Sequence, residues 1–370
     1  MIFLMFLCLY MLAHNFLAVL YLKIAALALR RDQRVSVSAV QKVSVIMPVY
    51  NEQECIIRKM ENLLACLIRF NRPCEVLIGS DGSTDDTPGR VEAFIRERQL
   101  EGWRLAAFKK QGKGTTVNQL IRQSTGDLIV STDADTHMAP EALGFIVKAF
   151  EKDDRLGCLS SIPQHDGQDM TIQSWYWKYE LSFREAASRL GRLVVATGWL
   201  YAFRKDAFRD IPASAMADDL WVPLTILLQN KKSMHLKGLK ALSELTDDHV
   251  EVKRRTRVIT GGVDVVKRLF PEIMKKPVLL FVVFSHKINR WLIPVWLVGF
   301  VLSSCVLNPT IVFVYGILLA VLVGALSPKR CYYLLYSAFS PVLSAVQVVA
   351  RKDFSKWDHT RKEAGWDKKG

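Results

Sequence analysis

A regular alternation of strand-like and helix-like patterns between residues 43 and 136 constrains the fold more than any other feature. The run Val43-Ser-Val-Ile-Met47 is apolar and rich in β-branched residues, and residues 56–67 then carry apolar side chains at helical spacing. The same order recurs along the chain. The predicted strands are residues 43–47, 75–79, 103–108 and 128–130. Strands that alternate with helices predict an α/β fold, with a parallel sheet covered by helices on both faces.

A polar motif follows each of the four predicted strands. The motifs are Pro48-Val-Tyr-Asn-Glu52, Asp81-Gly-Ser-Thr-Asp85, Gly112-Lys113-Gly114 and Asp133-Ala-Asp135. Taken singly, each is also compatible with an ordinary turn or with the start of a helix. Ligands of parallel sheets bind at the carboxyl ends of the strands. Four such motifs at one sheet edge therefore predict a single ligand site there.

The last of these motifs predicts a divalent cation. We expect Asp133 and Asp135 at the end of a strand, on the same side of it, because side chains alternate along strands. Two hard oxygen ligands suit Mg²⁺ or Mn²⁺ that keeps other coordination positions for phosphate. Short acidic pairs are also common in surface turns, so the prediction depends on the neighbouring motifs.

The N-terminal segment is apolar enough to cross a membrane. The first 22 residues carry no formal charge, and the apolar pattern continues to Leu29. The basic residues Arg30, Arg31 and Arg34 follow, and the positive-inside rule places what comes after them in the cytoplasm. A cleavable signal peptide is the alternative, but a basic n-region is missing and the run is too long. We expect a retained transmembrane anchor over residues 1–29.

The C-terminal third is expected to contact the membrane in several ways. Residues 264–290 mix apolar and basic side chains and predict a helix region in the interface. Residues 291–326 predict a transmembrane hairpin. Positive charge on both sides of residues 331–350 indicates a re-entrant or membrane-surface segment, which leaves the basic tail, residues 351–370, in the cytoplasm.

The formal net charge of +14 raises the possibility of a nucleic-acid-binding protein. The basic residues, however, gather beside apolar segments, where anionic lipid head groups explain them. We therefore expect membrane lipids as partners and no nucleic acid. The seven cysteines include no C-x-x-C pair, which favours reduced thiols in the cytosol.

The four motifs together resemble those of the nucleotide-sugar-binding half of the family 2 glycosyltransferases, which have the GT-A fold. The resemblance extends over nearly the whole chain after residue 42 and implies that residues 43–262 form a GT-A domain facing the cytoplasm. It also implies a set of residues that bind a nucleotide-sugar donor. These are Pro48, Tyr50, Glu52, Asp81, Lys113, Asp133, Arg255 and Arg257.

The resemblance gives most of these residues a role. Tyr50 and Glu52 would help to hold the base and ribose, Asp81 would accept from a pyrimidine ring, and Lys113 would lie near the base or diphosphate. Asp135 would bind the metal, and Asp133 would contact the ribose or the metal shell. A bound Mg²⁺ or Mn²⁺ would neutralise the nucleoside diphosphate as it leaves the sugar.

Two further segments resemble the acceptor half of the family. The pair Asp218-Asp219 falls where the family carries its acidic pair, so we expect Asp219 as general base and Asp218 as its orienter. Adjacent carboxylates are also common at helix N-termini. A glycine-containing loop that borders the acceptor is expected to contribute Gly198, Trp199 and Tyr201. Residues 175–185 match an aromatic-acidic helix of the family, although an amphipathic core helix explains them equally well.

The basic run from Lys253 to Gly261 occupies the position of the family's Q-(Q/R)-x-R-W signature. Arg255 and Arg257 would clamp diphosphate oxygens. Arg254 replaces the glutamine and Val258 replaces the tryptophan, and the loss of that tryptophan puts processivity in doubt. A plain basic stretch near the membrane is the alternative.

The predicted protein is an inverting, metal-dependent glycosyltransferase in the bacterial inner membrane. The expected donor is a UDP-sugar, with a GDP-sugar as the alternative, and the expected acceptor is lipid-linked or a glycan. Two other hypotheses remain, a processive polysaccharide synthase that extrudes its polymer and a catalytically silent nucleotide-binding scaffold. A silent scaffold would be expected to lack Asp135 or Asp219, and both are present. The sequence does not predict an oligomeric state.

Overall fold

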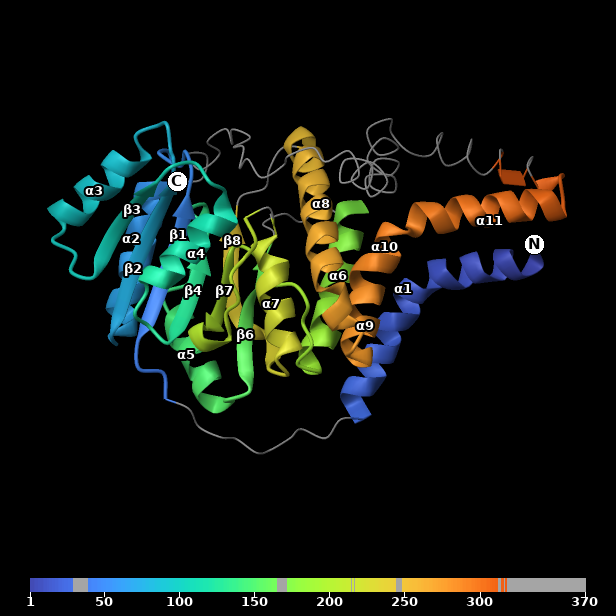
Figure 1. Ribbon diagram of the computed structural model, residues 1–370, viewed down its shortest axis with the longest axis horizontal. Helices are drawn as coiled ribbons and strands as arrows, with labels where there is room; N and C mark the ends of the chain where they lie inside the picture. Colours follow the sequence, from blue (N-terminus) through green and yellow to red (C-terminus); the bar gives the residue numbers. More distant parts are fainter. Residues whose placement is uncertain are drawn as a thin grey trace.

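The computed structural model describes residues 1–28, 39–164, 172–213, 215, 217–243, 248–311, 314, 315 and 317. Within these residues the chain forms one mixed sheet of eight strands (Figure 1) in the order β3-β2-β1-β4-β7-β6-β8-β5. The strands are β1 Val43–Val49, β2 Cys74–Asp81, β3 Trp103–Phe108, β4 Leu128–Thr132, β5 Thr136–Met138, β6 Leu156–Gln164, β7 Leu200–Arg204 and β8 Lys232–Ser243.

The four predicted strands form the parallel part of this sheet. β1 lies between β2 and β4 and runs parallel to both, and β3 continues the parallel order beyond β2. All seven residues of β1 are buried, as expected for a strand with helices on both faces. The expectation of a parallel sheet does not extend further, because β7 pairs with both β4 and β6 in the antiparallel sense.

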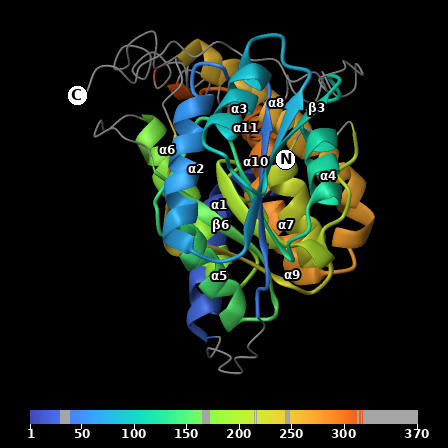
Figure 2. The same ribbon diagram turned by 90° about the vertical axis from the view of Figure 1, so that its left-hand side faces the viewer.

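Helices cover both faces of the sheet. In Figure 2, α2 (Ile56–Phe70) and α5 (Ala142–Lys152) lie on one side, and α4 (Lys113–Gln123) and α7 (Asp218–Leu228) lie on the other. Each face has its own cluster of buried apolar side chains. The remaining helices of this part are α3 Thr87–Glu97, α6 Ile172–Arg189 and α8 Asp248–Ile273, with a short 3-10 turn at Lys205–Ala207.

One glycine sets the distance between α4 and the sheet. A Cβ atom at Gly79 on β2 would lie 2.9 Å from side-chain atoms of Leu120 and Thr116 on α4. Any larger side chain at this position would push the helix away from the strand. The close approach fixes the start of α4, which carries Lys113, relative to the carboxyl end of β2.

The apolar helices α1 (Ile2–Ala28) and α11 (Ile293–Leu307) lie alongside each other, at the end of the molecule opposite β3 (Figure 1). Among the described residues, α1 is long and apolar enough to cross a bilayer. The segment Pro277–Trp291, which comprises α9 Pro277–Val283, the π-helix η2 Phe284–Ile288 and α10 Asn289–Trp291, meets α11 at a bend of 64°.

The second half of α1 packs into the α/β domain. Ala18, Val19 and Leu22 belong to the same buried cluster as side chains from β7 and α7. Polar contacts also join the first half of α1 to η2 and α10, because His14 Nε2 lies 2.9 Å from Ser285 Oγ and Asn289 Nδ2 donates to the carbonyl of Met11 at 2.9 Å. Such packing favours a retained helix over a cleaved signal peptide.

Several predicted segments lie outside the described residues. These are the basic residues Arg30, Arg31 and Arg34, the end of the predicted hairpin, the segment 331–350 and the tail 351–370. The predicted domain boundaries therefore remain predictions. The boundary between residues 262 and 264 falls inside α8, which ends at Ile273, and a turn at residues 274–276 separates it from α9.

Candidate functional site

The loops that follow β1 and β2 are joined into one surface at the sheet edge. Asn51 adopts the left-handed conformation, with φ of 55°, and its side-chain oxygen accepts a hydrogen bond from the Thr84 amide at 2.8 Å. The amide of Glu52 donates to Thr87 Oγ1 at 2.8 Å. Two of the motifs predicted from the sequence therefore lie side by side, as a shared ligand site requires.

Tyr50 and Glu52 lie in this surface, and both are partly exposed. The ammonium of Lys110 lies 3.5 Å from the centre of the Tyr50 ring, which is a close cation–π contact. Lys110 was not among the predicted residues, although the pair Lys109-Lys110, one residue before the motif Gly112-Lys113-Gly114, was a usable signal. Pro48 is buried at the end of β1, where it pairs with Gly79.

Asp81 shapes the loop that leads into α4. Its side chain is fully buried and accepts hydrogen bonds from the amides of Gln111, at 2.8 Å, and Gly112, at 3.1 Å, and from Thr116 Oγ1 at 3.2 Å. Gly112 has φ of 94°, a conformation that favours glycine. This geometry commits Asp81 to the loop, and it leaves no exposed surface for the pyrimidine contact that the resemblance implied.

Lys113 connects the two predicted acidic motifs. Its ammonium donates to Asp133 Oδ1 at 3.0 Å and lies 3.5 Å from Asp218 Oδ1. Burial alone would lower the pKa of Lys113, but the charges of Asp133 and Asp218 raise it above its usual value. Lys113 is therefore a fixed positive charge between the turn after β4 and the start of α7.

Asp133 and Asp135 lie in a turn and not on a strand. β4 ends at Thr132 and β5 begins at Thr136, so the alternation of side chains along a strand does not apply to the two carboxylates. This corrects the geometry expected from the sequence. The turn follows the carboxyl end of a central parallel strand, where ligands of such sheets bind.

The donor set of this turn fits a divalent cation that is shared with a ligand. In the part of the chain that the structure describes, no group of three or more His, Cys, Asp or Glu side chains converges to hold a metal. Mg²⁺ is often bound by one or two carboxylates together with substrate phosphates, and Asp133 and Asp135 supply oxygen ligands of that kind. These two residues would therefore need phosphate oxygens to complete the coordination.

The acidic pair at the start of α7 divides into one anchored and one free carboxylate. Asp218 is buried and accepts a hydrogen bond from the phenol of Tyr201 at 2.9 Å. The Asp219 side chain makes no hydrogen bond to the described residues and lies beside Gly198, where an added Cβ would be 3.9 Å from Asp219 Oδ2. Burial, together with the charge of Asp218, raises the pKa of the Asp219 carboxyl.

The predicted acceptor residues occupy different environments. Trp199 is partly exposed, and its carbonyl accepts hydrogen bonds from Thr132 Oγ1 at 3.0 Å and from the Asp133 amide at 3.3 Å. Gly198 lies at the Asp219 carboxylate. Tyr201 is fully buried, and burial followed by the charge of Asp218 raises its pKa well above its usual value. Tyr201 therefore supports Asp218 and has no surface for an acceptor.

The predicted diphosphate clamp lies on α8. The side chain of Arg255 is outside the described residues, whereas Arg257 is described and partly exposed. Val258, at the position of the family's tryptophan, is 50% exposed. The clamp remains a prediction.

Glu180, a buried residue of the segment 175–185 that was matched to the family's aromatic-acidic helix, connects α6 to the π-helix. Glu180 accepts from Arg184 Nε at 2.7 Å and from Arg290 at 2.5 Å, and it lies 3.1 Å from His286 Nε2. Burial alone would raise the pKa of Glu180, but His286, Arg290 and Arg184 hold it well below its usual range. Arg184 and Glu180 are four residues apart, so both lie on one face of α6.

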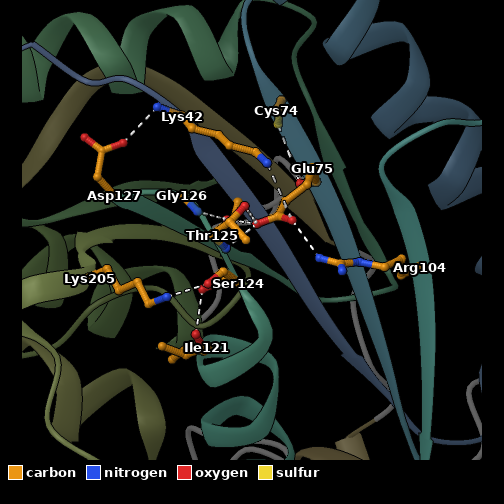
Figure 3. Close-up of polar contacts among 11 residues, drawn as sticks. Lys42, Cys74, Glu75, Arg104, Ile121, Ser124, Thr125, Gly126, Asp127 and Lys205 are labelled. Carbon is orange, nitrogen blue, oxygen red and sulfur yellow. Dashed lines mark hydrogen bonds and ion pairs between the residues drawn. The ribbon is translucent and has the colours of Figure 1, made fainter.

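A second buried carboxylate lies at the opposite edge of the sheet, at the amino ends of the strands (Figure 3). Glu75 accepts hydrogen bonds from Ser44 Oγ at 2.5 Å, the Thr125 amide at 2.6 Å and Arg104 at 2.8 Å. Burial alone would raise its pKa, but the hydrogen bonds from Ser44 and Thr125 hold it below the usual value. This cluster lies away from the motifs described above, and it joins β1, β2 and β3 to the residues before β4.

The mixed sheet, with its polar motifs at the carboxyl ends of parallel strands and an acidic turn after β4, defines a GT-A domain. Residues 44–212 match the family described as glycosyl transferase family 2, and this part of the chain is a domain of that family. A solved mannosyltransferase from Pyrobaculum calidifontis, in complex with GDP-Man and Mn²⁺, has the same fold. It superposes with a TM-score of 0.71 at 21% identity, over 94% of this chain and 100% of that one.

The alignments with curated relatives cover smaller parts of the chain. An undecaprenyl-phosphate 4-deoxy-4-formamido-L-arabinose transferase from Serratia proteamaculans is 28% identical over 165 residues, which are 44% of this chain and 46% of that protein. A poly-β-1,6-N-acetyl-D-glucosamine synthase from Staphylococcus aureus is 23% identical over 267 residues, 67% of this chain and 61% of the relative. The chain thus spans about half the length of the first of these relatives.

Proposed function

We propose that this protein is a membrane-bound glycosyltransferase that uses a nucleotide-sugar donor and a divalent cation. The observation that carries the proposal is the position of Lys113, 3.0 Å from Asp133 and 3.5 Å from Asp218. One ammonium thereby joins the turn that would hold the donor's diphosphate to the acidic pair that would activate the acceptor. The family of residues 44–212 supports the same activity.

The chemistry requires a base, an attacking oxygen and a leaving group. Asp219 would take the proton from an acceptor hydroxyl, because its carboxylate accepts no hydrogen bond from the described residues and its raised pKa makes it a better proton acceptor. The deprotonated oxygen would attack the anomeric carbon, and the bond to the nucleoside diphosphate would break with inversion. Asp218, held by Tyr201, would keep Asp219 in place.

The proposed cation site consists of Asp133 and Asp135. A Mg²⁺ or Mn²⁺ at these carboxylates would neutralise the negative charge that develops on the leaving diphosphate. Lys113 would contribute a second positive charge from the protein on the same side. The mannosyltransferase with the same fold was solved with Mn²⁺, which supports a divalent cation but does not select between the two metals.

Donor and acceptor are proposed by class. We propose a UDP-sugar, with a GDP-sugar as the alternative that the mannosyltransferase complex supports. The names of the two relatives include one lipid phosphate and one polysaccharide, so either a lipid-linked or a glycan acceptor agrees with them. The apolar α1, packed onto the domain, supports a site at the cytoplasmic face of a bacterial inner membrane.

A donor screen tests the proposal. Purified full-length protein would be incubated with UDP- and GDP-sugars and membrane lipid extract, and released nucleoside diphosphate would be measured. We expect release with at least one donor, and loss of release in Asp219→Asn. Asp206→Asn serves as the matched control, because that carboxylate is exposed and pairs only with Lys231 among the contacts described. Equal release by wild type and Asp219→Asn would contradict the assigned base.

A further inference from the structure

Helix α2 presents polar side chains on the face that it turns toward the sheet. Lys59, Asn62 and Cys66 are buried on this face, among the apolar side chains of Ile56 and Met60. Lys59 is only 3% exposed. A lysine is almost never buried to this extent unless its ammonium has partners, so its contacts require an explanation.

The ammonium of Lys59 bridges the two ends of the acidic turn. It donates to Thr132 Oγ1, on the last residue of β4, at 2.9 Å, and to the carbonyl of Thr136, on the first residue of β5, at 2.6 Å. The residues between these two partners are Asp133, Ala134 and Asp135. Lys59 therefore closes the turn from its buried side.

The bridge continues to the loop predicted to border the acceptor. The same Thr132 hydroxyl donates to the carbonyl of Trp199 at 3.0 Å. One buried side chain of α2 is thus connected, through a single hydroxyl, to the backbone beside Gly198 and Asp219.

Asn62 holds the chain at a second point further along. Its amide nitrogen donates to the carbonyl of Met138 at 2.8 Å, and its oxygen accepts from the Met138 amide at 2.9 Å. This contact fixes the end of β5 and touches neither carboxylate. Asn62 therefore holds the end of the strand, whereas Lys59 holds the two ends of the turn.

Burying a charged group in a protein interior costs more free energy than burying a neutral group that makes the same two hydrogen bonds. Burial lowers the pKa of Lys59 to about 7, while Cys66 and Asp133 act in the opposite direction. Asp133 favours the ammonium form of Lys59, but burial outweighs this effect. The position of Lys59 beneath the turn and its two hydrogen bonds indicate a role in holding the turn.

We propose that Lys59 is a positioning residue that holds the Asp133–Asp135 turn in the shape that accepts a divalent cation together with a nucleoside diphosphate. The inference rests on the proposed function, because it assigns a purpose to a turn whose ligands are themselves proposed. The competing explanation is that Lys59 only stabilises the packing of α2 against β4 and β5.

Calorimetric binding of UDP and of GDP to full-length protein in detergent separates the two explanations. Each nucleotide would be titrated once in EDTA and once in Mn²⁺, and the ratio of the two dissociation constants gives the metal-dependent gain. The variants are Lys59→Met, which removes the amino group, and Thr132→Val, which removes one of the two hydrogen-bond partners of Lys59. Glu75→Gln is the control, because it disturbs a buried carboxylate at the opposite edge of the sheet (Figure 3).

We expect Lys59→Met to lose about 10- to 100-fold of the metal-dependent gain, the range found when groups behind metal ligands are removed. Thr132→Val should lose less, in the same direction. Glu75→Gln should lower the unfolding temperature and leave the ratio of dissociation constants unchanged. If Lys59 had only a structural role, Lys59→Met would give the same result. If Lys59→Met does not fold, the ratio measured for Thr132→Val decides the matter.

An unchanged ratio in folded Lys59→Met, or in Thr132→Val where Lys59→Met does not fold, would overturn the inference and leave the proposed function intact. Wild-type protein that binds neither nucleotide would instead overturn the proposed function, and the inference with it. Binding of the wild type that is equally strong in EDTA and in Mn²⁺ would overturn the cation site and the positioning role together.

Discussion

The phenol of Tyr201 donates a hydrogen bond to Asp218 at 2.9 Å, and both groups are buried. Asp219, the next residue, has a side chain that forms no hydrogen bond with the residues described. The two carboxylates of the acidic pair therefore differ in what they can do, although the sequence presents them as equals. An anchored carboxylate can orient its neighbour, and an unengaged one can accept a proton.

The first prediction follows from this difference. Asp219→Asn keeps the shape of the side chain and removes the proton acceptor, so turnover should fall by about 10²- to 10⁴-fold while donor binding is retained. The measurement is steady-state release of nucleoside diphosphate, combined with calorimetric binding of the donor. A nearly wild-type Asp219→Asn beside an inactive Asp218→Asn would show that the roles are reversed.

The second prediction concerns pH. A general base works only when ionised, so the raised pKa of Asp219 should place the acid limb of the turnover profile at a higher pH than an ordinary aspartate would give. Asp218→Asn removes one cause of that rise and should move the acid limb to lower pH. Turnover rates measured from acid to neutral pH test both statements. An acid limb that moves upward in Asp218→Asn would contradict the assignment.

The third prediction concerns the cation. Asp135→Ala should abolish turnover, because a site of two carboxylates cannot lose one and still hold the metal against the diphosphate. EDTA should have the same effect on the wild type, with recovery on addition of Mg²⁺ or Mn²⁺. Asp154→Ala, at an exposed carboxylate between α5 and β6, is the control and should remain active. Full activity of the wild type in EDTA would refute the site.

The fourth prediction tests whether α1 belongs to the fold. Leu22 is 2% exposed in the main core cluster, whereas Leu20 on the same helix is 57% exposed. Leu22→Ala should reduce the free energy of unfolding by about 2–5 kcal/mol, and Leu20→Ala should change it little in detergent. Thermal unfolding of the two variants provides the comparison. Equal effects would show that α1 is only an anchor.

The fifth prediction concerns product length. Val258 on α8 is half exposed and offers no wide, flat face for a sugar ring, unlike the tryptophan of processive relatives. We expect one sugar, or very few, to be added at each encounter with an acceptor. Product sizing at limiting acceptor concentration tests this, and long polymer from purified protein would contradict it.

The parallel core of the fold was predictable because its signals are local. Each of the strands β1 to β4 is a short apolar run followed by a polar motif, and β2 lies between β1 and β3, the strands next to it in sequence. The pairing of β5 with β8, by contrast, joins residues 136–138 to residues 241–243. Nothing in either short segment indicates its partner, since this register depends on the folded domain.

The candidate site shows the same limit at the level of single residues. Residue types and spacing selected Asp133, Lys113 and Asp219 as candidates, and their roles remain predictions. The sequence did not indicate that the buried Asp81 side chain would hydrogen-bond to the loop before α4. Lys59 was not among the predicted residues, because the helical spacing of this segment was defined by its apolar residues. Its position, three residues after Ile56 and one before Met60, already placed it on the buried stripe.

The packing of α1 into the domain has a consequence for the choice of acceptor. A catalytic domain on a loose tether samples many heights above a bilayer, whereas a helix that is part of the domain's own core gives the site one height. Asn15 strengthens this arrangement, because its carbonyl accepts a hydrogen bond from Tyr179 on α6 at 3.1 Å. The distance of the acceptor hydroxyl from the membrane then limits which acceptors react, in addition to how well the site binds them. We therefore expect a hydroxyl carried at that depth to react faster than the same hydroxyl held further from or closer to the membrane.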